Sequence, residues 1–172
     1  MKSLKQIIIV LSIFSFAYSH AQNVNLLTKN EYSNLLISGV NWKIIKETKG
    51  NLEKLNSFFG NDLSINIIEE PSLGKEIKNR SLYFYFEDKS DTGNEFELVS
   101  FNIESNLASL TIKDKKITIG NNISKLGNVM IITSKDGNKK IVFGTNWTHD
   151  GLWIEFDQVT NVITKIEYML YD

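Results

Sequence analysis

The sequence predicts an α+β fold made of two tandem repeats of about 70 residues, each a short helical segment packed on an antiparallel β-sheet. The 172 residues are 42% hydrophobic and 23% charged, which is typical of a globular protein. Several segments alternate apolar and polar residues with the period of a strand. Three segments also recur in order: residues 51–55, 81–87 and 96–105 align with residues 122–126, 151–157 and 163–172.

This alignment places repeat 1 at residues 37–105 and repeat 2 at residues 106–172, within one compact domain. The alternative to a true repeat is that the two halves align only because any two amphipathic hairpins have similar sequence patterns. A repeat interpretation further predicts that the two halves contribute to one continuous sheet, since both end in the same kind of hairpin.

Residues 1–21 have the features of a secretory signal peptide. Lys2 and Lys5 precede an apolar run at residues 7–17, and Ser19-His20-Ala21 has small residues at both ends of a cleavage site. The alternative, a membrane-anchoring helix, needs about 20 apolar residues, more than this run contains. We therefore expect an exported protein of the periplasm or the extracellular medium, with no integral membrane segment after signal cleavage.

The first half of the remaining chain opens with a lead-in at residues 22–36 that we expect to be helical. Asn51 can cap a helix whose apolar residues share one face, and Gly60 can end it. An apolar, β-branched segment follows at residues 63–70, and the single proline, Pro71, begins a loop that reaches Asn79. Strands are expected at residues 40–48, 81–87 and 96–103, the last two as an antiparallel hairpin.

The second half predicts shorter elements in a similar order. Residues 123–126 suit one helical turn, and Asp136-Gly137 is a strong hairpin signal. Strands are expected at residues 107–113, 116–119, 129–133, 140–143, 151–157 and 162–171.

The alternation also predicts which faces of the sheet are buried. The expected core positions are Leu82, Phe84, Phe86, Val99, Phe101, Ile103, Leu152, Ile154, Phe156, Ile166, Tyr168 and Leu170. The opposite face would carry Tyr83, Tyr85, Trp153 and Glu155, with Trp147 just before that strand and Trp42 on an earlier one. Tyrosine and tryptophan often anchor binding partners. Whether another segment covers this face is left open by the sequence.

The motifs on which the repeat depends are LEKLNSFFG followed by SLYFYFE and FELVSFNI, and ITIGNNISKLG followed by GLWIEFD and ITKIEYML. This pattern resembles the BamE-like and β-lactamase-inhibitor-protein-like group. The resemblance implies exported modules that bind proteins through a sheet face and loops. The chain has no cysteine, so it lacks both the lipid-modified cysteine and the disulfides found in that group.

Catalytic and cofactor motifs find little support. With no cysteine, and with His149 the one histidine beyond the signal peptide, we expect no metal site and no cofactor. His149 precedes Asp150, which could suggest a dyad, but a solvated turn explains it better. Residues 88–95 resemble a calcium loop without its spacing. A net charge of −1 gives no case for nucleic acid.

The sequence therefore predicts a non-catalytic binding module whose partner is an envelope or extracellular protein. Its expected binding residues are Tyr83, Tyr85, Trp147, Trp153 and Glu155. The alternatives are a carboxylate-based hydrolase that uses Glu155 with another acid, a glycan-binding protein, or a structural subunit whose aromatic face is buried between subunits.

Overall fold

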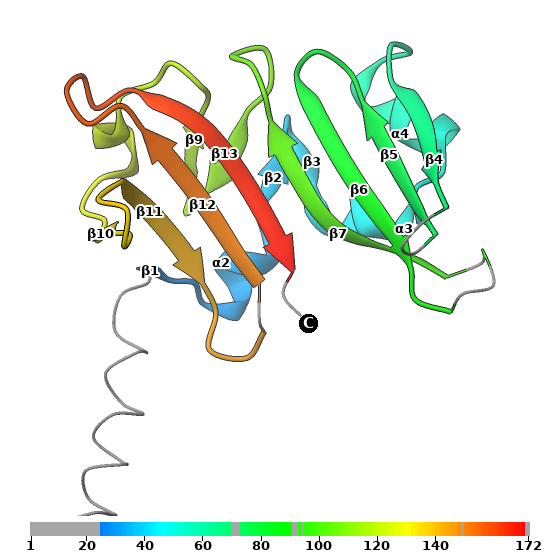
Figure 1. Cartoon of the computed structure of the whole chain (residues 1–172), viewed down its shortest axis with the longest axis horizontal. Coiled ribbons are helices and arrows are strands. Elements are labelled where there is room, and N and C mark those ends of the chain that lie inside the picture. Colours follow the sequence, from blue (N-terminus) through cyan, green and yellow to red (C-terminus); the bar gives the residue numbers. More distant parts are fainter. Residues whose placement is uncertain (1–24, 70–72, 91–92, 94, 149, 171–172) are drawn as a thin grey trace, which may run out of the picture.

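The computed structural model describes residues 25–69, 73–90, 93, 95–148 and 150–170 (Figure 1). The predicted signal peptide at residues 1–21 lies outside them. The helices are α2 (Lys29–Ser33), α3 (Trp42–Glu47) and α4 (Leu52–Phe59), with a 3-10 turn η1 (Ile123–Leu126). The strands are β1 (Asn25–Leu26), β2 (Leu36–Ile37), β3 (Val40–Asn41), β4 (Ser64–Ile68), β5 (Gly74–Lys78), β6 (Leu82–Asp88), β7 (Phe96–Ile103), β8 (Leu110–Ile112), β9 (Lys115–Ile117), β10 (Ile131–Thr133), β11 (Lys139–Gly144), β12 (Asp150–Phe156) and β13 (Ile163–Leu170).

Within the described residues the strands form two sheets. The large sheet has nine strands in the order β1-β11-β12-β13-β7-β6-β5-β4, and β10 also pairs with β11. Its pairings are antiparallel except for β1 with β11, so the sheet is mixed. The small sheet has four strands in the order β3-β2-β8-β9.

The predicted α+β fold of two helix-on-sheet repeats is wrong, because the protein is mostly β. The helix expected in each repeat is an eight-residue α-helix in the first half, α4, and only the four-residue turn η1 in the second. The sequence pattern did not anticipate that β2, β3, β8 and β9 would pair into a sheet of their own. The alternation of apolar and polar residues along a segment indicates only that one of its faces is buried, and not which strands it pairs with.

Three segments differ from their predicted secondary structure. In the lead-in expected to be helical, the described residues form helix only over α2, and strand β1 and the start of β2 flank it. The strand expected at residues 40–48 is mostly helix α3, because the Asn41 side chain accepts the Lys43 backbone N–H as a helix cap. The first helical turns then bury Trp42 and Ile45, which are three residues apart on one face. The loop expected between Pro71 and Asn79 contains strand β5, whose sequence GKEIK buries only Ile77 and the small Gly74.

Several elements match their predictions closely. The turn η1 spans the residues expected for it, and β7 covers residues 96–103 as predicted. The hairpin of β6 and β7 and the final hairpin of β12 and β13 are both antiparallel, as expected. Helix α4 begins after Asn51, whose side chain accepts the Lys54 N–H, and it ends at Gly60 with φ of 97°.

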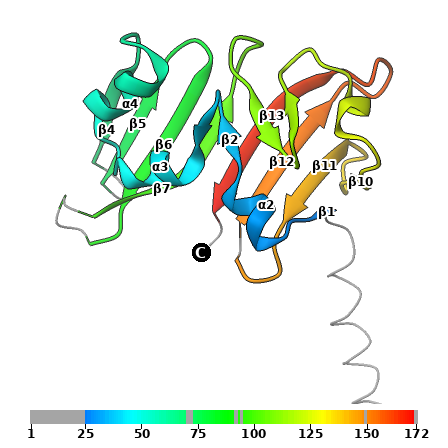
Figure 2. The ribbon, with the colours of Figure 1, turned by 180° about the vertical axis from the view of Figure 1, so that it is seen from behind.

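The core lies between the large sheet and a layer made of the helices and the small sheet, which Figure 2 shows from behind. We call the covered side of the large sheet the inner face and the opposite side the outer face. Helix α4 contacts the inner face where the rings of Phe59 and Phe84 lie 5.3 Å apart. Helix α3 does so where the rings of Trp42 and Tyr168 lie 5.8 Å apart.

Most of the predicted core residues are buried on the inner face, and the two exceptions are the half-buried Val99 and Leu170. A register shift explains Val99. Tyr85 pairs with Ser100 while Phe86 pairs with Leu98, so Val99 is the extra residue of a bulge. Leu98 takes the buried position instead.

The two hairpins join through β7 and β13, which pair from Ile166 opposite Ile103 to Met169 opposite Ser100. Across this junction the rings of Phe101 and Tyr168 stack 5.2 Å apart with an interplanar angle of 9°. The Tyr168 hydroxyl donates to Asp150 Oδ2 at 2.7 Å, and the Tyr32 hydroxyl of α2 donates to the same oxygen. Burial raises the pKa of Tyr168, and so does its bond to Asp150, so it remains a donor at neutral pH.

We expect Tyr168→Phe to lower the free energy of unfolding by about 1–3 kcal/mol, because the buried Asp150 carboxylate loses one of its donors. Tyr83→Phe is the matched control, since it removes a hydroxyl from a half-buried residue on the outer face and should cost less than about 1 kcal/mol. Urea unfolding of both variants measures the difference. Equal losses would show that the Asp150 bond contributes little.

Candidate functional site

The outer face of the large sheet has no helix or strand packed over it among the described residues (Figures 1 and 2). The register fixes which side chains it carries. One cross-strand row runs through Val142, Trp153, Glu167, Asn102, Tyr83, Lys78 and Ser64. A parallel row runs through Gly144, Gly151, Met169, Ser100, Tyr85, Glu76 and Asn66. The face therefore mixes aromatic, amide and charged groups.

The register brings Tyr83, Tyr85, Trp153 and Glu155 to this one face, as the alternation predicted. Strands β13 and β7 lie between Trp153 and Tyr83, which places the two residues three strand spacings apart, or roughly 14 Å. Glu167 and Asn102 fill the row between them. The aromatic residues are thus two separate groups with a polar strip between them.

Two rings on this face lie against glycines. A Cβ built on Gly74 would come within 2.6 Å of the Tyr85 hydroxyl oxygen, so the absent side chain makes room for the ring. A Cβ on Gly151 would come within 3.0 Å of Trp153 Nε1. The Lys140 ammonium lies 4.6 Å from the centroid of the Trp153 ring, a cation–π contact. The rings therefore stabilise the sheet surface as well as offering apolar area.

Tyr83 is held by a neighbouring strand. Its hydroxyl donates to Glu76 Oε1 at 3.1 Å, and Lys78 lies 4.0 Å from the other oxygen of the same carboxylate. Burial raises the pKa of Tyr83 to about 12, with the hydrogen bond to Glu76 acting in the same direction. Tyr83 therefore remains a neutral, oriented side chain at any physiological pH.

Glu155 lies at one end of the outer face, exposed and opposite Lys140 on one side and Lys165 on the other. Lys165 donates to Glu167 at 2.8 Å, and this bond raises the pKa of Lys165. Alternating charges across these strands leave Glu155 flanked by cations.

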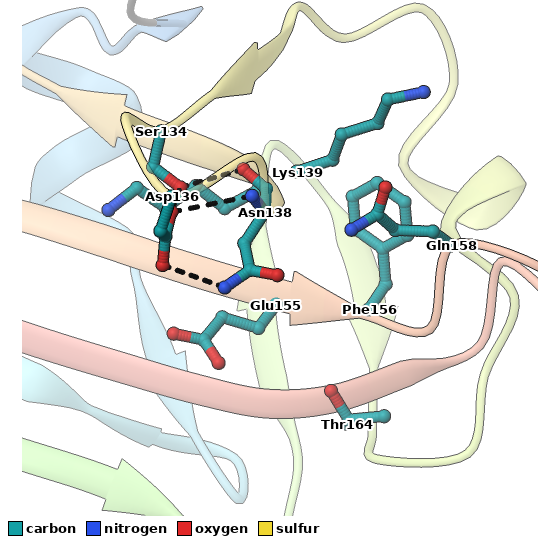
Figure 3. Close-up of a pocket in the computed structure, with 9 residues that line it drawn as sticks. Ser134, Asp136, Asn138, Lys139, Glu155, Phe156, Gln158 and Thr164 are labelled. Atoms are coloured by element: carbon teal, nitrogen blue, oxygen red, sulfur yellow. Dashed lines mark hydrogen bonds between the residues drawn. The ribbon is translucent and has the colours of Figure 1, made fainter.

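A hollow of about 280 Å³ lies between Glu155 and the turn that joins β10 to β11 (Figure 3). Asp136 is the second carboxylate in it, and Asn138 Nδ2 donates to Asp136 Oδ2 at 2.7 Å. The Ser134 hydroxyl and then the Asn138 amide lower the pKa of Asp136. A general acid needs a raised pKa, and the hydrogen bonds here work in the opposite direction.

A second hollow of about 610 Å³ lies at the other end of the outer face. Tyr83 and Lys78 line it, together with Arg80 and Glu104. The uncovered face thus ends in a polar hollow on each side, and both hollows carry charges of both signs. Sequence reasoning missed this second hollow, because Lys78 fell within the segment expected to be a loop and Arg80 fell between that loop and the next expected strand.

Trp147 and Trp42 do not join this face. Trp147 lies in the connection between β11 and β12, 40% exposed, with its ring 6.3 Å from that of Tyr32 on α2. Trp42 is buried in the core, since the strand expected for it is helix α3. His149 lies outside the described residues.

Among the described residues, no group of three or more histidine, cysteine or acidic side chains could hold a metal ion. No helix in this part of the chain is both long and apolar enough to span a membrane.

Comparisons with known proteins add little. No family model matches the chain, and no curated protein matches it. Among solved structures, it is similar to a cysteine-rich secretory protein from Staphylococcus aureus at 15% sequence identity, over 69% of this chain and 42% of that one. The TM-score of this match is 0.36, so no argument rests on it.

We expect Gly74→Ala to lower the free energy of unfolding by about 1–3 kcal/mol, because the added methyl group displaces the Tyr85 ring. Gly151→Ala should cost less, since its nearest contact is longer. In a Tyr85→Ala background the Gly74→Ala penalty should shrink, and urea unfolding of the four variants measures this coupling. If Gly74→Ala lowered the free energy of unfolding equally in both backgrounds, the strain would not arise from contact with the Tyr85 ring.

Tyr83 gives a pH-dependent prediction. Its folded pKa of about 12 exceeds the ordinary value of 10.0, so its contribution to stability is complete below pH 10 and is lost as the pH rises through 12. Ultraviolet titration of tyrosinate should show one group in the wild type, absent in Tyr83→Phe, that ionises near pH 12. Glu76→Gln should move this ionisation toward lower pH. If the ionisation lost in Tyr83→Phe had its midpoint near pH 10 in the wild type, the assignment would be refuted.

Proposed function

We propose that the protein is an exported, non-catalytic binding module that engages an envelope or extracellular protein through the outer face of its large sheet. The observation that supports this most strongly is the uncovered outer face, to which the register brings two aromatic groups and a polar strip. Side chains on the inner face are buried in the core, whereas no helix or strand among the described residues covers the side chains on the outer face.

The chemistry of the face fits a protein partner. Tyrosine and tryptophan bury large areas with few rotatable bonds, and both groups are already ordered by their glycine and Glu76 contacts. Ordering before binding reduces the entropy lost on association. On this face Lys165 contacts Glu167 and Lys78 lies beside Glu76, which supports recognition through charge complementarity.

Site-specific photocrosslinking tests the proposed face. A benzophenone amino acid in place of Ser100, which lies between the aromatic groups, should form one defined adduct in cells that express the protein at native level. The matched controls are the same amino acid at Leu107 and at Val159, which are 82% and 90% exposed apolar residues. Adducts of equal yield at all three positions would contradict a specific interface.

With the partner identified by mass spectrometry, the anchors can be tested on purified proteins. We expect Tyr83→Ala and Trp153→Ala each to weaken binding by about 30-fold, the effect of a typical hot-spot residue. Leu107→Ala and Val159→Ala should leave the affinity within about twofold. Calorimetry measures the affinities, and circular dichroism verifies that each variant is folded. Unchanged affinity in both tyrosine and tryptophan variants would reject this site.

A further inference from the structure

The two edges of the large sheet are protected to different degrees. At one edge, β11 pairs with β10 at residues 139–141 and with β1 at residues 143–144. The Asn25 side chain of β1 is bonded to Met130, the residue just before β10: its Nδ2 donates to Met130 O at 2.9 Å, and its Oδ1 accepts from Met130 N at 2.7 Å. At the opposite edge, β4 pairs with β5 and with no further strand among the described residues.

Strand β4 lacks two of the usual devices that prevent pairing at an edge. Its sequence, SINII, contains no charge and no proline. Ile65 and Ile67 are 40% and 50% exposed. Their partners Ile77 and Lys75 show that both isoleucines point to the inner face, so they prolong the apolar side of the sheet past its last buried residue.

We propose that β4 pairs antiparallel with β4 of a second copy of this chain, about a two-fold axis at Asn66. In this register Ile65 lies opposite Ile67 of the partner on the inner face, and Ser64 lies opposite Ile68 on the outer face. The Asn66 side chains meet on the axis, where each amide can donate to the other. This interface is separate from the binding face proposed above and does not rest on it.

Self-complementarity is the reason to choose a second copy over another extended segment. An isologous contact needs the same patch to match itself under a two-fold rotation. Here the apolar residues at positions 65 and 67 exchange places under that rotation, and no residue of β4 places a charge opposite its own copy. Pairing would also supply partners for the unpaired backbone groups of the free edge.

The interface is small, since it consists of five strand residues from each chain. It falls below the roughly 800 Å² per partner of a standard interface, so the dimer is expected to be weak. We expect purified wild-type protein to pass from monomer to dimer across roughly 10 µM to 1 mM in sedimentation equilibrium.

Opposite charges introduced at position 66 test both whether β4 forms the interface and whether the two copies pair about Asn66. Asn66→Asp and Asn66→Lys each place like charges opposite one another, so each variant alone should dimerise at least about tenfold more weakly than the wild type. A 1:1 mixture of the two should recover dimers, because an aspartate then faces a lysine. Circular dichroism and thermal unfolding verify that both variants are folded.

Ser64 provides the matched control. Position 64 faces position 68 of the partner and not its own copy, so mixing Ser64→Asp with Ser64→Lys should give no recovery beyond that of either variant alone. Ile67→Lys should also abolish the dimer without changing the axis residue. A wild type that stays monomeric throughout the range, dimers undiminished in the Asn66 variants, or a mixture without recovery would each overturn the proposal.

Discussion

The pairing of β7 with β13 is the contact on which the rest of the structure depends. It joins two hairpins that are distant in the sequence into one sheet, and it sets which residues share a row on the outer face. Tyr168 stabilises this pairing on the inner face, because its ring stacks on Phe101 and its hydroxyl donates to Asp150. Since Tyr32 donates to the same carboxylate, α2 is attached to the sheet at this point as well.

Period-two alternation predicted the parts of the fold that local sequence determines. Phe84 and Tyr83 were assigned to opposite faces because neighbouring residues of a strand point to opposite sides, and the structure agrees. The alternation failed at Val99, where a bulge adds one residue and reverses the phase. It also failed for residues 42–47, where the Asn41 cap favours a helix despite two adjacent isoleucines.

The missing parts of the site were those that depend on contacts between distant strands. Tyr83, Tyr85, Trp153 and Glu155 could be placed on one face, but their separation by β13 and β7 follows only from the sheet order. The flattening of Tyr85 on Gly74 depends on a cross-strand neighbour eleven positions away. Trp147 was misplaced for the same reason, since its aromatic neighbour Tyr32 belongs to a helix that the alternation could not position.

The proposed binding face and the proposed β4 dimer are related, because β4 lies at one edge of the sheet that carries the face. Pairing across β4 would continue both cross-strand rows into a second molecule, because the rows run perpendicular to the strands. The groups nearest the axis would be Tyr83 and Tyr85 of each copy, with the Trp153 groups at the far ends. A partner that presents its binding surface more than once would then engage two faces at a fixed spacing, and the second contact would form at a raised effective concentration. On these two proposals, weak self-association increases avidity without any new residue on the proposed face.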